Sequence, residues 1–346
     1  VQSRFPMSER PYRDMAEELG TTEDNLIERI GYLKQKNVIR QIGAIFDTRR
    51  LGYKTTLVAF RLPPGKLEKG AHHISKHPGV SHNYARNGNF NLWFTIAVPP
   101  SEEIPDVVQR MAEETGAESA RLMPTIRFFK IGVNFDMVKK KGSSFNFSPD
   151  NVKSSEDKAA SDKEAAESWN KAVPITEAEK DAIRGMQEDL ELIPRPYDSI
   201  AQQLGMSTDE LFALAKDFQE RRIMRRYSAV LHHRRSGFRA NAMIVWKVPE
   251  ERSEEVGLIM AANDAVTHCY ERPTFPDWPY THFTMVHATT PEGCEEINNE
   301  ISEATGITER LVLYSTREYK KTRVRYFVPD YDDYVDKEKP DAVITA

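Results

Sequence analysis

The sequence is poor in cysteine and has no long hydrophobic run. Its two cysteines, Cys269 and Cys294, are too few for a disulfide framework or for a zinc site with four thiolate ligands. No segment reaches the roughly 18 consecutive apolar residues of a membrane-spanning helix, and the first residues lack the pattern of a signal peptide. We therefore expect a reduced, cytoplasmic protein without a membrane partner.

No sign of charge dominates the chain. The 48 Lys and Arg against 53 Asp and Glu give a formal net charge of -5, which disfavours a globally basic nucleic-acid-binding protein but leaves a local basic patch open. The hydrophobic fraction of 39% is low for a single globule of 346 residues. A polar linker between two ordinary cores explains this fraction, and the length suits about two domains of roughly 150 residues.

The chain contains the same pattern twice. Matching segments are 185 residues apart near the start of each copy, then 186 and finally 189, and the spacing changes where loops are expected. The matched segments are 10–12 with 195–197, 79–86 with 265–272, and 94–95 with 283–284. A spacing that persists over most of a chain indicates an internal duplication.

Composition and the repeat together predict the domain organisation. Residues 142–173 are rich in Ser, Lys, Asp, Glu and Ala, which predicts a flexible linker, with a short helix near 161–169. The expected domains are a truncated N-terminal helix-turn-helix at 1–38, a first ferredoxin-like domain at 39–141, the linker at 142–173, a second helix-turn-helix at 174–223, a second ferredoxin-like domain at 224–330 and a C-terminal tail at 331–346. We call the parts before and after the linker the first and second copies.

Each copy shows the same predicted order of elements. Two helices around a glycine form a helix-turn-helix, expected at 12–19 and 23–36 in the first copy, and at 198–204 and 208–221 in the second, where a helix at 177–190 precedes them. The apolar periodicity that follows predicts strand, helix, strand, strand, helix, strand. These elements are expected at 53–62, 67–76, 80–86, 91–98, 101–114 and 120–129, and at 238–248, 251–262, 266–272, 282–288, 291–305 and 310–316, with an earlier strand at 40–47.

This order predicts an α+β fold with two tandem copies of a winged-helix-like helix-turn-helix and a ferredoxin-like βαββαβ sheet. Face-to-face packing of the two sheets would bury the faces that the helices leave free. The order resembles the Lrp/AsnC family of transcription regulators, which implies DNA binding. The helices that would enter the DNA groove, however, begin with acidic residues at 23–24 and 209–210, whereas phosphate contacts need Lys and Arg. DNA is therefore a disfavoured partner.

Motifs in the sheets carry a more specific resemblance. The first copy reads His82-Asn-Tyr-Ala-Arg86 and then Asn91-Leu-Trp-Phe-Thr95, and the second reads His268-Cys-Tyr-Glu-Arg-Pro273, Trp278-Pro-Tyr280 and Met285-Val-His287. These strings are similar to the siroheme decarboxylases, an Lrp/AsnC-like branch with two related subunits that are sometimes fused. The resemblance implies a carboxy-lyase that removes CO2 from two acetate side chains of siroheme without an added cofactor. Its product, didecarboxysiroheme, lies on the route to haem or haem d1.

The resemblance also implies that the two halves form an intramolecular pseudo-heterodimer, and a homodimer of the whole chain is a further option. Three alternatives stay open: a DNA-binding regulator, a regulator that senses haem or another tetrapyrrole, and a module that binds an amino acid. Conversion of siroheme, as opposed to binding alone, distinguishes the enzyme from all three.

The implied substrate suggests roles for particular side chains. Siroheme is a flat, apolar ring bordered by carboxylates, so aromatic or Met walls and an arginine rim suit it. The expected carboxylate-binding residues are Arg40, Arg86, Arg225, Arg226 and Arg272. The expected ring contacts are Tyr84, Tyr270, Trp93, Trp278, Tyr280 and Met243. Trp93, like Trp246, lies in an apolar strand and is better explained as core, and each His-x-Tyr-x-Arg triplet could be a hydrogen-bonded sheet surface.

Histidine is the natural proton donor near neutral pH. His233 and His287 are the first candidates, with His268 and His82 as alternatives, and His233 is also a candidate axial ligand to the siroheme iron. No separate protein metal site is expected. The first copy has Thr48 where the second has His233, and Val98 near the position of His287. These differences predict one active pocket per chain, dominated by the second copy.

Overall fold

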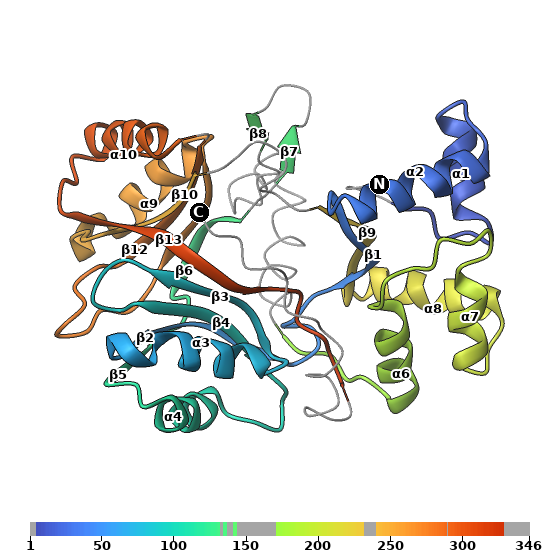
Figure 1. The fold of residues 1–346 in the computed structure, drawn as a ribbon, viewed down its shortest axis with the longest axis horizontal. Coiled ribbons are helices and arrows are strands. Elements are labelled where there is room, and N and C mark those ends of the chain that lie inside the picture. The colour runs from blue at the N-terminus through green and yellow to red at the C-terminus, as the bar shows by residue number, and fades with distance from the viewer. Residues whose placement is uncertain are drawn as a thin grey trace, which may run out of the picture. The chain divides into compact units, whose positions relative to one another are not determined.

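The computed structural model describes residues 5–131, 134–136, 141–143, 171–231, 240–288 and 290–328. The chain divides into two compact units (Figure 1). Unit 1 comprises Val1–Lys54, Ala166–His232 and Arg325–Ala346, and unit 2 comprises Thr55–Ala165 and His233–Val324. Each unit therefore combines corresponding parts of both copies: the helix-turn-helix parts in one, the ferredoxin-like parts in the other.

Unit 1 contains the helices that the sequence predicts. The first copy supplies α1 (Pro11–Glu18) and α2 (Glu23–Gln35), and the second supplies α6 (Glu177–Met186), α7 (Tyr197–Gln203) and α8 (Thr208–Glu220). Between the paired helices, Gly20 and Gly205 have φ of +63° and +66°, a conformation that glycine adopts without steric cost. Capping boxes start α6 and α8, where Thr176 and Ser207 each exchange hydrogen bonds with a glutamate three residues later.

A two-stranded sheet joins the copies within unit 1. β1 (Ile39–Phe46) pairs antiparallel with β9 (Met224–Leu231), for example Ala44 opposite Tyr227. The sequence predicted β1 as a strand at 40–47 but neither β9 nor the pairing of the two strands. The repeated Arg-Pro-Tyr motif adds a reciprocal contact, since the Tyr12 hydroxyl donates to the Glu191 carbonyl at 2.8 Å and the Tyr197 hydroxyl donates to the Pro6 carbonyl at 3.0 Å. The motif therefore has a structural role within unit 1.

Unit 2 is built on a nine-stranded sheet in the order β5-β2-β4-β3-β13-β10-β12-β11-β6. The first copy contributes β2 (Lys54–Arg61), β3 (Val80–Arg86), β4 (Leu92–Val98), β5 (Ser119–Met123) and β6 (Arg127–Ile131). The second contributes β10 (Ala240–Trp246), β11 (Val266–Glu271), β12 (His282–Ala288) and β13 (Arg310–Lys321). The helices are α3 (Leu67–Lys76), α4 (Ile104–Thr115), α9 (Ser253–Ala262) and α10 (Pro291–Thr305), with short turns η1 (Pro64–Lys66) and η4 (Glu250–Arg252), and a small hairpin pairs β7 (Asn134–Asp136) with β8 (Lys141–Ser143).

Three apolar cores lie on the two sides of this sheet. Two of them lie under the helices, one for each copy. The third is shared by both copies and occupies the opposite side, which we call the inner face; it contains Ala59, Phe90, Trp93, Met123, Met243, Val245, Trp278, Phe283 and Leu313. The predicted α+β fold and the face-to-face burial are confirmed.

Within this sheet, one strand of each copy also pairs with a strand of the other copy, which the sequence did not predict. β13 pairs first with β10 of its own copy and then with β3 of the first copy. The segment 120–129, expected as one strand, is two, because Pro124 cannot donate to a ladder. β5 therefore stays on β2, and β6 crosses to pair with β11 of the second copy.

Strand register corrects one of the spacings assigned from the sequence. Tyr84 lies opposite Trp93, and the equivalent Tyr270 lies opposite Phe283. Trp93 therefore corresponds to Phe283, a spacing of 190, and the assigned spacing of 189 was wrong here. A shift of one residue exchanges the faces of a strand, so the counterpart of His287 is Ala97 and not Val98.

The linker helix expected near 161–169 lies outside the described residues. Within the described part of the chain, no helix combines the length and the apolar character needed to cross a membrane.

Candidate functional site

The two His-x-Tyr-x-Arg triplets lie on β3 and on β11, with Arg272 directly after the end of β11, and face away from the helices. The residue between His and Tyr in each triplet points the other way. Asn83 Nδ2 donates to the Ala71 carbonyl of α3 at 2.8 Å, and Cys269 Sγ lies 3.7 Å from the Gly257 carbonyl of α9. Alternation along a strand then places the triplets on the inner face. The rings of each His and Tyr pair stack at centroid separations of 6.3 Å and 6.1 Å.

Arg86 and Arg272, at the ends of the triplets, are buried and hold the copies together. They are 7% and 8% exposed. Arg86 Nη1 donates to the Leu313 carbonyl of the second copy at 2.9 Å, and Arg272 Nη1 donates to the Met123 carbonyl of the first. Burial lowers the pKa of each guanidinium to about 10, so both are charged at neutral pH. The Nε of each has no hydrogen-bond partner in the structure.

The triplet histidines are held by hydroxyl groups. His82 Nδ1 lies 3.0 Å from Ser81 Oγ, and His268 Nδ1 lies 3.0 Å from Thr267 Oγ1. Burial, and then the charge of Arg272, lowers the pKa of His268 to about 4. The ring of His268 is therefore neutral at pH 7.

His287 lies on the inner face of β12, half-buried. Its neighbours two and four residues away, Met285 and Phe283, pack in or against the shared core, so alternation turns His287 to the same side. It stands directly opposite Asn241 of β10. His233, the other leading candidate, lies outside the described residues.

Most of the expected ring contacts belong to the shared core. Trp93, Trp278 and Met243 are 1%, 4% and 5% exposed, and the two indole rings lie 5.2 Å apart. Tyr280 packs on Trp278 but is only half-buried. Trp246 instead lies under the helices, where its Nε1 donates to Thr284 at 2.9 Å. Tyr84, Tyr270 and Tyr280 are the expected ring contacts that stay partly accessible.

The remaining arginines belong to unit 1. Arg225 donates from Nε and Nη2 to Asp47 Oδ2 at 3.0 Å and 2.6 Å, a partner that the sequence analysis did not identify. The side chains of Arg40 on β1 and Arg226 on β9 make no hydrogen bond or ion pair to another residue of the described chain. The described site residues that the sequence predicted therefore form two sets. The three arginines of unit 1 are one set, and the residues of unit 2, which lie on the inner face of its sheet, are the other.

The described residues include no group of three or more His, Cys, Asp and Glu side chains placed to hold a metal ion.

One further polar side chain on the inner face, Asn241, was not predicted as a site residue. Its signal in the sequence is a lone amide at an inward position of an otherwise apolar strand.

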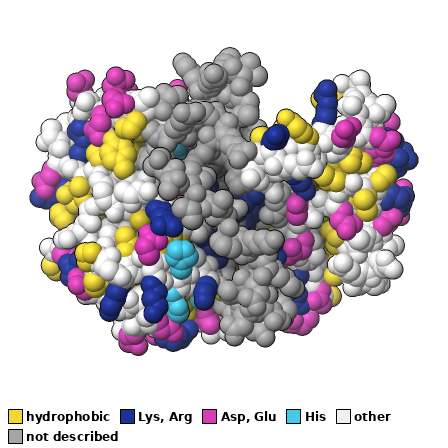
Figure 2. All heavy atoms as spheres, viewed as in Figure 1, with side chains coloured by type: hydrophobic (Ala, Val, Ile, Leu, Met, Phe, Trp, Pro, Cys, Tyr) yellow, Lys and Arg dark blue, Asp and Glu magenta, His cyan; other side chains and the backbone are white. Residues whose placement is uncertain are grey.

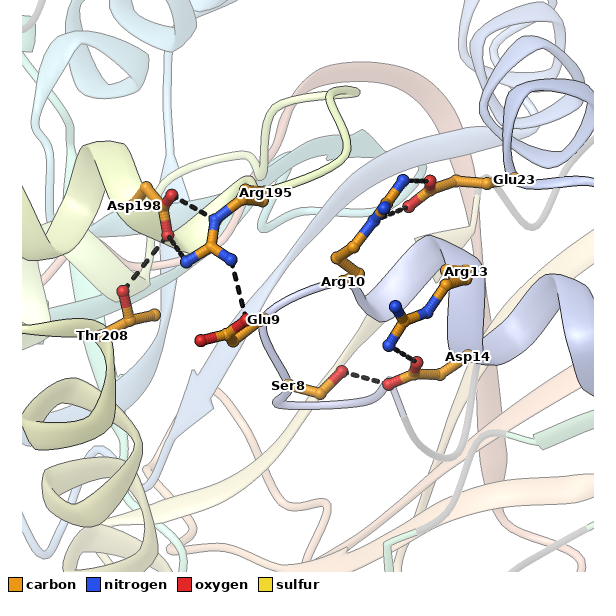
Figure 3. A network of polar contacts seen from close by, with 9 residues as sticks. All are labelled: Ser8, Glu9, Arg10, Arg13, Asp14, Glu23, Arg195, Asp198 and Thr208. Atoms are coloured by element: carbon orange, nitrogen blue, oxygen red, sulfur yellow. Dashed lines mark hydrogen bonds and ion pairs between the residues drawn. The ribbon is translucent and has the colours of Figure 1, made fainter.

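At the helix-turn-helix parts, arginines are paired with carboxylates (Figure 3). Arg10 pairs with Glu23 at the start of α2, and Arg195 donates to Asp198 at 2.6 Å and to Glu9 at 2.7 Å. Figure 2 shows basic and acidic side chains interspersed over these helices, without a continuous basic area on the described part of that face. The arginines at the starts of these helices are therefore neutralised by carboxylates and are not available for phosphate contacts.

Comparison with known proteins places the chain in a family. A model for the siroheme decarboxylase NirDL-like HTH domain matches residues 1–40 and 179–225, and a model for an AsnC-like ligand binding domain matches 50–130 and 235–320. A siroheme decarboxylase of Hydrogenobacter thermophilus is 38% identical over 96% of this chain and 94% of its own length. The chain belongs to the siroheme decarboxylase family. The NirDL subunit of siroheme decarboxylase from Paracoccus pantotrophus is 30% identical over 92% of this chain and 93% of its own.

Solved structures agree with this membership of the siroheme decarboxylase family. The crystal structure of the siroheme decarboxylase NirDL matches with a TM-score of 0.72 at 33% identity, covering 97% of this chain and 95% of that one. The same enzyme in complex with an iron-uroporphyrin III analogue matches with a TM-score of 0.71 at 32% identity over the same shares.

Other members of the family are single subunits. A siroheme decarboxylase beta subunit of Methanosarcina barkeri is 49% identical over 41% of this chain and 94% of its own length. An alpha subunit of Desulfovibrio desulfuricans is 36% identical over 40% of this chain and 79% of its own. The present chain, with both copies, is the fused form. A transcription regulator is not favoured.

Proposed function

We propose that this chain is a siroheme decarboxylase that removes CO2 from two acetate side chains of siroheme and releases didecarboxysiroheme. The observation that carries the proposal is the match along the whole chain, 38% identity over 96% of it, to a protein of that activity. A relative bound to an iron-uroporphyrin III analogue supports a tetrapyrrole as the ligand class.

The reaction needs no added cofactor under this proposal. Breaking the bond between the methylene and carboxyl carbons releases CO2 and leaves an electron pair on the methylene carbon. The conjugated ring of the substrate can delocalise that pair. A proton delivered to the same carbon then converts the acetate into a methyl group, and such a general acid typically contributes about 10²–10⁴-fold.

His287 is our preferred proton donor among the described residues. His268 shares its face, but a pKa of about 4 leaves almost no protonated ring at pH 7. His82 stays an alternative donor from the first copy. For His233, outside the described residues, both proposed roles are retained: proton donor and axial ligand to the substrate iron.

Carboxylate recognition divides among the arginines according to their partners. The side chains of Arg40 and Arg226 make no hydrogen bond or ion pair to another described residue, whereas Arg225 pairs with the buried Asp47. Arg86 and Arg272 hold backbone carbonyls and keep only Nε without a partner. We assign ring contacts to Tyr84, Tyr270 and Tyr280, with Trp93, Trp278 and Met243 supporting them from beneath.

The two copies act, in this proposal, as the two subunits of an intramolecular pseudo-heterodimer with one dominant pocket in the second copy. The supporting difference is Ala97 where the second copy has His287. A homodimer of the whole chain is a separate expectation, and the mass of the protein in solution, measured by light scattering, decides it.

The decisive experiment is anaerobic incubation of the purified chain with siroheme alone, followed by mass spectrometry of the tetrapyrrole. We expect the loss of one and then two molecules of CO2. A shifted Soret band without any loss of mass would contradict the enzyme and indicate a tetrapyrrole-binding regulator. Activity that appears only with an added cofactor would contradict cofactor independence.

A further inference from the structure

A row of polar side chains crosses one end of the otherwise apolar inner face. Arg86 of β3 lies opposite Ser315 of β13, and Asn241 of β10 lies opposite His287 of β12. The pairing of Ala242 with Tyr314 places Asn241 beside Ser315 in the antiparallel register. Directly opposite residues share a face, so the four side chains form one continuous row across four adjacent strands.

Three atoms of this row are buried and lack a hydrogen-bond partner. They are Arg86 Nε, Ser315 Oγ and Asn241 Oδ1. A buried polar atom that stays unpaired costs about 1–3 kcal/mol of desolvation. Because buried polar groups in folded proteins are almost always paired, three unpaired ones on adjacent strands indicate a place that a ligand completes.

The chemistry of the three groups selects the ligand. The Arg86 Nε–H can only donate, and the Ser315 hydroxyl can donate. The Asn241 amide presents either its oxygen or, after a half-turn of the amide, its N–H. A carboxylate oxygen accepts from all three, and a guanidinium makes that hydrogen bond charge-assisted.

The equivalent positions of the other half do not form such a row. The spacing of 190 that relates Met123 to Leu313 makes Thr125 the counterpart of Ser315, because both lie two residues further along. Thr125 is exposed, beyond the end of β5. The counterpart of His287 is Ala97. The row therefore occurs once among the described residues and combines one residue of the first copy with three of the second.

We propose that Ser315 and Asn241, together with Arg86 Nε, bind an acetate carboxylate of the substrate and hold it beside His287. This inference rests on the proposed function, since it assigns one carboxylate subsite of the same reaction. It adds two positioning residues, Ser315 and Asn241, that the family motifs do not include. Bound substrate would then supply hydrogen-bond partners for polar atoms that the described protein leaves unpaired.

The test compares Ser315→Ala, Asn241→Ala and the double variant with the wild type. Loss of a hydrogen bond to a charged group should raise the KM for siroheme about tenfold for each single change. The midpoint of thermal unfolding of the free protein should stay the same or rise, because each change removes an unpaired buried atom. Thr125→Ala is the matched control and should alter neither quantity.

A second readout separates this inference from the proposed function. Iron-uroporphyrin III keeps its carboxylates, so its dissociation constant, followed by the Soret band, measures the row without turnover. Weaker binding by the double variant supports the subsite even if the wild type converts no siroheme. Equal binding and equal KM in an active protein overturn the subsite alone, and a wild type that neither binds nor converts a tetrapyrrole overturns both.

Discussion

At the scale of single residues, two histidines on the same face of the sheet have different surroundings. His287 belongs to the polar row, whereas His268 is kept neutral by burial and by Arg272. The sequence placed His287 among the first candidates for the proton donor and His268 among the alternatives. The structure supplies a physical reason for the same order.

Replacing His287 with Gln should therefore lower kcat by about 10²–10⁴-fold, because Gln keeps a hydrogen-bonding side chain but cannot deliver a proton. Initial rates of siroheme decarboxylation measure the effect. His73→Gln is the control, since His73 is exposed on α3 and pairs with Glu114 at 2.8 Å. Undiminished kcat in His287→Gln would move the donor to His82 or His233.

The depressed pKa of His268 also makes the fold sensitive to acid. The pKa is about 4 in the folded chain against 6.5 for the unperturbed side chain. Between these values the unfolded chain binds a proton that the folded chain does not, so stability is full above pH 6.5 and falls as the pH falls towards 4. The loss amounts to about 3 kcal/mol for such a group.

His77, whose pKa burial also lowers to about 4, contributes in the same direction. Burial lowers the pKa of His282 as well, so His282 adds to this loss. His268→Gln should therefore remove only part of the combined loss, because His77 and His282 still titrate below pH 6.5. Urea unfolding at a series of pH values measures this. A variant whose free energy of unfolding falls as steeply as that of the wild type would show that His268 is not the cause, and His73→Gln should match the wild type throughout.

At the scale of elements, the two halves of the sheet are joined by their last strands and by two buried arginines. Arg272→Ala removes a charged donor and leaves the Met123 carbonyl unpaired, which should cost about 1.5–3 kcal/mol of unfolding free energy. Arg127→Ala, which breaks exposed pairs with Glu254 and Glu271, should cost no more than about 1 kcal/mol. Equal midpoints of urea unfolding for Arg272→Ala and the wild type would refute the joining role.

Sequence patterns predicted most elements but not their partners. Apolar periodicity and capping residues placed the helices to within a few residues, as at α3 and α10. They could not show that β6 crosses to β11 or that β1 pairs with β9, because strand pairing depends on contacts remote in the sequence. Pro124 can be read in the sequence, but the division of 120–129 into two strands with different partners depends on a neighbouring strand that the local sequence does not identify.

At the scale of the whole molecule, the helix-turn-helix parts keep a regulator's fold without its charge. We expect no salt-dependent binding to duplex DNA, because Arg10 and Arg195 at the helix starts are paired with Glu23, Asp198 and Glu9. A gel-shift titration at low salt, with a DNA-binding member of the AsnC family as positive control, measures this. A shift that weakens as salt is added would contradict the expectation.

The sequence alone determined the duplication, the α+β class, the motifs of the siroheme decarboxylase family and the acidic character of the would-be DNA-reading helices. Each of these is a local or periodic property, so it can be read along the chain. Only the tertiary structure decided which atoms have partners. Arg86 and Arg272 donate to backbone carbonyls, Ala97 occupies the position equivalent to that of His287, and Ser315 lies beside Asn241. Partnership depends on strand register, and a shift of one residue reverses every face.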